Sequence, residues 1–198
     1  MRAFQQKCAT MSNSDQKIDF RGLLKKANAY KQVLQNTIDY REQWTKTLKP
    51  LILETLDEVK EETGIKASVE SRDQINNLEA IVFDLGRSAS GISENLENTD
   101  IKRTMVKFNG SLIYQQLFNG KIMVMTSSPF IEGYGEPKPP RMVEILRPDE
   151  LKKPFILRHL ELLFKELIEW EDYDDDEPSN GKKPIGFNPI VMSQIDDE

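Results

Sequence analysis

The stretch SLIYQQLFNGKIMVMT (residues 111–126) decides the fold that we predict for this chain. Two runs rich in β-branched and aromatic residues flank Asn119-Gly120. This pair is preferred in two-residue type I′ turns, where both central residues need a positive φ. The stretch therefore predicts an antiparallel hairpin of strands 111–118 and 121–126, with Phe118 opposite Lys121.

Four more short segments carry strand-like residues on either side of this hairpin. They are residues 67–71, 78–85, 104–109 and 141–146. Asn109-Gly110 resembles a second turn between consecutive strands. The order of these segments predicts an antiparallel β-meander of about five to six strands.

Helical periodicity dominates the chain before and after the meander. Apolar residues recur at steps of three and four over residues 20–59, and the stripe stays in phase across Pro50. We therefore favour one long helix kinked at Pro50 over a helical hairpin. A second stripe predicts a C-terminal helix over residues 151–170. The predicted fold class is α+β, with the meander packed against both helices.

The domain organisation follows from changes in composition. We predict a flexible leader (1–17), in which Met11 is an alternative start, and a single α+β domain (18–171). An acidic linker (172–183) then leads to an apolar segment, PIGFNPIVM, and a polar tail (184–198). We expect this segment to dock in an apolar groove with Phe187 as its anchor. The groove could belong to the same chain, to a second subunit or to a client-binding surface.

Charge and composition exclude several classes of function. The chain has 198 residues, a net charge of −6 and a pI near 5.1. An acidic chain is a poor binder of nucleic acid, because phosphate neutralisation dominates that binding. No apolar run approaches the roughly 18 residues of a membrane helix, so no membrane partner is expected. A single cysteine favours a reducing compartment, and we expect a cytoplasmic protein.

The charge is unevenly distributed. Residues 1–50 hold ten Lys or Arg and four Asp or Glu, whereas residues 161–198 hold three lysines and twelve acids. The basic first helix could contact an acidic partner or pack near the chain's own acidic helix.

The segment DLGRSASG (residues 84–91) is the candidate for a ligand or catalytic site. Glycine- and serine-rich turns expose backbone N–H groups that hold anions, and Arg87 would add charge. Asp84, Arg87, Ser88 and Ser90 are the residues that would bind an anionic substrate. The segment lacks the spacing of known phosphate-binding or nucleophile motifs. The alternative is a plain connection between strands.

Metal and cofactor chemistry finds little support. His159 is the only histidine and Cys8 the only cysteine, so a standard zinc site within one chain is excluded. Asp172, Asp174 and Asp176 have the first spacings of a calcium loop, but its required glycine and glutamate are missing. We predict no metal, no cofactor and no catalytic residue.

A partner-binding face is predicted from the hairpin register. Tyr114, Phe118, Met123 and Met125 would share one side of the sheet, and methionines with aromatics suit adaptable protein binding. The protein's own helix could equally cover this face. The loop FIEGYGEPKPP (residues 130–140) would present Tyr134 at its tip, stiffened by prolines.

Two functions are therefore in competition. The first is a non-enzymatic protein-binding, adaptor or chaperone-like protein, for which a homodimer is compatible with the sequence. The second is a small enzyme or ligand binder that uses the 84–91 segment. We favour the first, because the scarcity of His and Cys removes most hydrolytic and redox mechanisms.

Overall fold

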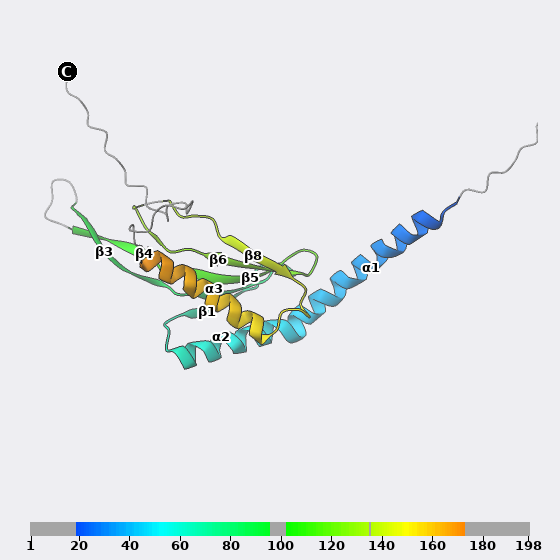
Figure 1. Cartoon of the computed structure of the whole chain (residues 1–198), viewed down its shortest axis with the longest axis horizontal. Helices are drawn as coiled ribbons and strands as arrows, with labels where there is room; N and C mark the ends of the chain where they lie inside the picture. The colour runs from blue at the N-terminus through cyan, green and yellow to red at the C-terminus, as the bar shows by residue number, and fades with distance from the viewer. Residues whose placement is uncertain (1–18, 96–101, 135, 173–198) are drawn as a thin grey trace, which may run out of the picture. The chain divides into compact units, whose positions relative to one another are not determined.

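The computed structural model describes residues 19–95, 102–134 and 136–172 (Figure 1). It has the predicted α+β architecture, with helices at either end of the strands. The chain divides into two compact units, Met1–Gln35 and Asn36–Glu198. The helices are α1 (Arg21–Gln43), the π-helical turn η1 (Trp44–Leu48), α2 (Lys49–Thr63) and α3 (Lys153–Glu171). The strands are β1 (Ser68–Arg72), β2 (Ala80–Asp84), β3 (Arg87–Asn95), β4 (Lys102–Phe108), β5 (Ser111–Gln116), β6 (Ile122–Ser127), β7 (Phe130–Ile131) and β8 (Arg141–Leu146).

Helical backbone runs on both sides of Pro50, as the apolar stripe predicted. The turn before the proline widens to π geometry, and the Lys49 N–H donates to the Trp44 carbonyl. Pro50 then lies in the first turn of α2, where its missing N–H costs little. Gly64 ends α2 in the left-handed conformation (φ 67°), and its N–H donates to the Lys60 carbonyl at 3.0 Å.

All strand pairs are antiparallel, and the strands form two sheets. The larger sheet has the order β1-β2-β5-β6-β8, and the smaller has the order β3-β4-β7. Two backbone hydrogen bonds link the sheets. The Leu85 N–H donates to the Gly110 carbonyl, and the Asn109 N–H donates to the Gly86 carbonyl. At Gly110 (φ 97°) a Cβ would lie 2.8 Å from the Ser127 carbonyl oxygen, so only glycine fits this junction.

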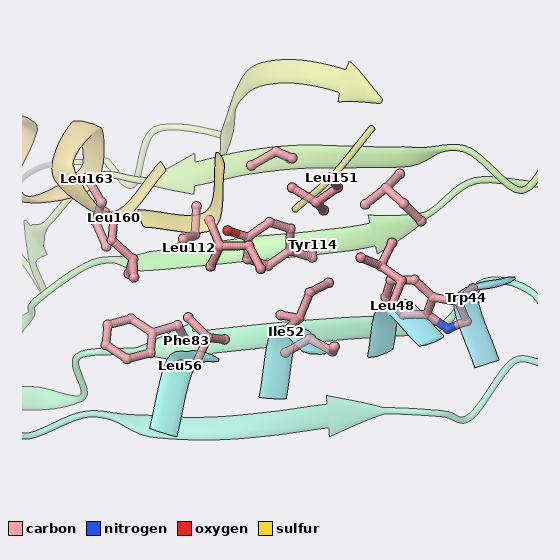
Figure 2. Close-up of a cluster of buried hydrophobic side chains, with 14 residues drawn as sticks. Trp44, Leu48, Ile52, Leu56, Phe83, Leu112, Tyr114, Leu151, Leu160 and Leu163 are labelled. Atoms are coloured by element: carbon pink, nitrogen blue, oxygen red, sulfur yellow. The ribbon is translucent and has the colours of Figure 1, made fainter. Parts of the chain in front are cut away.

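Helices α2 and α3 pack on one face of the larger sheet and form the core with it (Figure 2). Trp44, Leu48, Ile52 and Leu56 lie on a common buried side, as predicted from the stripe. They meet the sheet residues Ile81, Phe83, Leu112, Tyr114, Ile122 and Val124, together with Leu151, Ile156, Leu160 and Leu163.

The central hairpin forms, but its turn and register differ from the prediction. Leu117 N–H donates to the Lys121 carbonyl and Gly120 N–H to the Leu117 carbonyl, both at 2.8 Å. The loop is therefore Phe118-Asn119-Gly120, a turn closed by a glycine with φ 76°. Asn119 is not among the residues with positive φ, so the two-residue type I′ turn is wrong.

A register shift of one residue follows from this longer loop. Tyr114 pairs with Val124 rather than Met125, and Gln115 rather than Gln116 pairs with Met123. Because side chains alternate along a strand, a shift of one residue moves every side chain of one strand to the other face relative to its partner. The predicted Met/aromatic face is therefore divided between two faces.

Candidate protein-interaction surfaces

The residues predicted to bind an anion do not form a glycine-rich turn. Only Leu85 and Gly86 lie outside strands, and Arg87 begins β3. The Asp84 carboxylate accepts the Gly86 N–H at 2.9 Å. Ser88 Oγ donates to Asn109 Oδ1 at 2.9 Å, and Ser90 Oγ donates to the Met105 carbonyl at 2.8 Å. The Ser90 bond joins β3 to β4, the Ser88 bond joins β3 to the residue that follows β4, and the Asp84 bond lies within the connection between β2 and β3.

Arg87 takes part in an aromatic stack. Its guanidinium carbon lies 4.4 Å from the centroid of the Phe108 ring. Phe108 in turn stacks on Phe130, with centroids 4.3 Å apart and an interplanar angle of 8°. Cation–π contact of this kind stabilises the smaller sheet by about 0.5–1 kcal/mol at an exposed site.

The predicted partner-binding residues occupy four different environments. Tyr114 is fully buried in the core, so the assignment of this side chain to a surface is wrong. Phe118 is 75% exposed at the hairpin tip, where its carbonyl accepts a hydrogen bond from Arg41 at 2.7 Å. Met123 and Met125 are half-buried on the sheet face opposite Tyr114. Tyr134 is 39% exposed just after β7. Phe187 lies outside the described residues.

The first part of helix α1 exposes an apolar stripe that the site prediction missed. None of its residues from Arg21 to Gln43 is buried. Leu23 and Tyr30 are each 65% exposed. Phe20, Leu24, Leu34 and Ile38 lie on the same stripe and are all exposed. Periodicity identified these residues, but it could not predict their exposed fractions.

Helix α1 begins at a capped and charged end. Asp19 accepts the Arg21 backbone N–H at 3.0 Å, and its carboxylate also pairs with the Arg21 guanidinium at 2.8 Å. Arg21, Lys25, Lys26 and Lys31 are the charged residues of positions 21–38, and all four are basic. The exposed stripe is therefore flanked by positive charge.

A buried polar network joins the sheet to α3. The Tyr114 hydroxyl lies 3.2 Å from His159 Nδ1, and His159 Nε2 contacts Glu144 Oε1. Arg158 pairs with the same carboxylate oxygen. One tautomer satisfies every partner: Nε2–H donates to Glu144, and the Tyr114 hydroxyl donates to the unprotonated Nδ1.

The protonation states of this network follow from its burial. Burial lowers the pKa of His159 below its ordinary 6.5, although the Glu144 hydrogen bond opposes the shift. Burial also raises the pKa of Tyr114, and the nearby Glu144 carboxylate adds to that rise. Burial works to raise the pKa of Glu144, but the hydrogen bonds from His159 and Arg158 outweigh it and lower that pKa. A neutral histidine that already satisfies both neighbours is a structural link between β5, β8 and α3.

Metal and membrane features are sparse in the part of the chain that the structure describes. It holds no group of three or more His, Cys, Asp or Glu side chains placed to bind a metal. Its helices include none that is long and apolar enough to cross a bilayer.

Comparison with protein-family models, with curated proteins and with solved structures found no match to this chain.

Proposed function

We propose that this chain is a non-enzymatic protein-binding or adaptor protein of the cytoplasm, whose helix α1 takes up an acidic amphipathic helix of a partner. The exposed apolar stripe of α1 is the observation that carries the proposal. In proteins, most of the stability of a helix comes from the packing of its apolar face rather than from intrinsic helix propensity. A partner that covers the stripe would supply the missing packing.

The spacing of the stripe suits a helical partner. Phe20, Leu23, Ala27, Tyr30 and Leu34 follow one another at steps of three and four, which is the a/d pattern of a coiled coil over two heptads. Such a seam accepts the knobs of a second helix rather than an extended peptide. Burying each large apolar side chain contributes about 1.5–3 kcal/mol before the costs of association.

The charges that flank the seam favour an acidic partner over a second copy. With Phe20, Ala27 and Leu34 at position a of the heptad, Lys26 is at position g and Lys31 at position e. Positions g and e face each other across a parallel pair of helices. Pairing α1 with itself would place like charges together in either orientation. Glu or Asp at the same positions of a partner would form ion pairs, speed the encounter and make binding sensitive to salt.

The enzymatic alternative has weaker support. Asp84, Ser88 and Ser90 each make a hydrogen bond within the chain, and Arg87 stacks on Phe108. An anion would have to compete with these contacts. A ligand that binds the folded chain raises its melting temperature by mass action. Such a rise with phosphate, abolished by Arg87→Ala, would support the enzymatic alternative.

A designed peptide provides the test of the binding proposal. It carries three heptads with Leu at a and d and Glu at e and g, and its control carries Lys at e and g. The full chain is expected to bind the Glu peptide, more weakly at high salt, and to leave the Lys peptide unbound. The double variant Leu23→Asp, Leu34→Asp should lose at least tenfold in affinity while its melting temperature stays unchanged, because neither side chain is buried.

Three outcomes would count against the proposal. Equal binding of both peptides would remove the charge argument, and unchanged affinity of the double variant would place binding elsewhere. Binding of anionic phospholipid vesicles without binding of either peptide would identify α1 as a membrane-surface helix instead.

A further inference from the structure

A second apolar surface lies on the larger sheet, on the face opposite the core. We name it the methionine face and define it by Ile113, Met123, Met125, Met142 and Ile145. Met123 pairs with Ile145 and Met125 with Met142, so the face spans β5, β6 and the edge strand β8. Met142 is 57% and Ile145 45% exposed, and the other three are half-buried. The described helices α2 and α3 pack on the other side of these strands.

We propose that the C-terminal segment of the same chain, residues 184–192, packs on the methionine face. The inference is independent of the proposed function, because it concerns a different surface and an occupant within the chain. It assigns one of the three grooves that the sequence left open for the Phe187 anchor.

The first support is the place where α3 ends. Near its C-terminus, Leu167 would lie 3.0 Å from a Cβ built at Gly110, the residue whose Cβ would also touch the Ser127 carbonyl. Glu166 pairs with Arg141, the first residue of β8. These contacts place the turn that holds Glu166 and Leu167 over the end of the larger sheet at which Met125 and Met142 occupy the opposite face. The last residue of α3, Glu171, pairs with Lys107 of β4, so the helix ends just beyond that end of the larger sheet.

The second support is the length of chain that follows. Eleven residues, 173–183, separate the described end of the chain from the apolar segment. A flexible chain of that length spans about 17–20 Å on average, and about 36 Å when fully extended. The straight distance from a helix on one face to a segment on the other is two packed layers of about 10 Å each, and the chain must also pass around an edge of the sheet. The extended length of the connection exceeds the straight distance and leaves room for that detour.

The third support is the chemistry of the segment. Ile185, Phe187, Ile190, Val191 and Met192 are unusually apolar for the end of an acidic chain. Pro184 and Pro189 are unfavourable inside a helix and cannot donate to a central strand ladder. An extended segment that lies flat on a sheet face needs neither helical nor strand hydrogen bonds. Methionine side chains adapt to irregular partners, so Met123, Met125 and Met142 suit a segment without regular structure.

Methionine-methyl NMR on the full chain tests the proposal. The chain has seven methionines, so ¹³C-methyl labelling gives a small set of signals to assign. We expect nuclear Overhauser contacts between the methyl of Met192 and those of Met125 or Met142. Phe187→Ser should abolish these contacts and change the chemical shifts of the Met125 and Met142 methyl groups. The methyl signal of Met105, in β4, should keep its chemical shift. Deletion of residues 193–198, which removes only the polar tail, is the matched control and should leave all contacts in place.

Isotope mixing separates the possible occupants. Contacts that persist when labelled chains are diluted with unlabelled chains support docking within the chain. Contacts that fade on dilution would overturn that assignment in favour of a segment exchanged between two copies. Sheet signals unaffected by Phe187→Ser, or Met192 contacts only to other parts of the molecule, would overturn the proposal altogether.

Discussion

The replacement Gly120→Ala tests the observed hairpin turn and its packing on the helix. Gly120 has φ 76°, and an added Cβ would lie 2.7 Å from Tyr40 Cβ and 3.1 Å from the Thr37 carbonyl oxygen. The left-handed backbone alone costs alanine about 1–2 kcal/mol. Overpacking against the helix adds about 1–3 kcal/mol. We expect the free energy of unfolding to fall by roughly 2–5 kcal/mol, a large share of the stability of an ordinary domain.

Gly64→Ala is the matched control for this prediction. Gly64 has nearly the same φ, 67°, but nothing lies within 4 Å of its added Cβ. It should therefore show only the backbone cost, and the gain from a stiffer unfolded chain is common to both variants. Urea unfolding followed by tryptophan fluorescence measures both. Equal destabilisation of the two variants would refute the close approach of the turn to the helix.

Three further predictions concern the core. Trp44→Ala should cost about 3–5 kcal/mol of unfolding free energy, whereas exposed Tyr30→Ala should cost under about 0.5 kcal/mol; similar losses would contradict the burial of Trp44. The buried side-chain amide of Gln116 has no hydrogen-bond partner among the described residues, so Gln116→Leu should raise the free energy of unfolding by about 1 kcal/mol or more. A clearly lower melting temperature of this variant would show that the amide is satisfied. Folding lowers the pKa of His159, the only histidine, so the unfolded chain takes up the proton at a higher pH than the folded chain. The free energy of unfolding should therefore fall as the pH drops below about 6.5. A His159→Gln variant with the same fall in unfolding free energy would exclude the histidine as its source.

Helix periodicity was the most informative signal in the sequence. The stripe across Pro50 identified Trp44, Leu48 and Ile52 as a common buried side, because a 3.6-residue period depends on local spacing alone. The π-helical turn before Pro50 was not foreseen. It depends on the way the backbone accommodates the proline within an otherwise continuous helix.

The hairpin register could not be read from its residues. Both faces of β5 and β6 carry apolar side chains, so neither register leaves a polar face in the core, and the pattern specifies the pairing weakly. Asn-Gly also serves both two- and three-residue loops. Contacts from distant residues accompany the observed loop, among them the close approach of Tyr40 to Gly120 and the hydrogen bond from Arg41 to Phe118. A shift of one residue was enough to move Tyr114 into the core.

The candidate surfaces show the same division between local and distant information. The sequence identified the apolar residues of α1 but not their exposed fractions, which local spacing does not determine. It placed Ser88 and Ser90 in a turn, because glycine and serine are frequent in turns. In the structure Ser88 pairs with Lys107 of β4, and Ser90 donates to the Met105 carbonyl of the same strand. The contact of His159 with Tyr114 joins residues 45 positions apart and has no local signature.

Hydrogen exchange across residues 21–35 of the full chain tests the central claim, that helix α1 is a partner-binding surface. Amide exchange is measured with and without the designed Glu peptide, and the Lys peptide serves as the control. We predict rapid exchange over this stretch in the free chain and strong slowing with the Glu peptide alone, largest around Leu23, Tyr30 and Leu34. Unchanged exchange in this stretch at saturating Glu peptide, or equal slowing with the Lys peptide, would contradict the account.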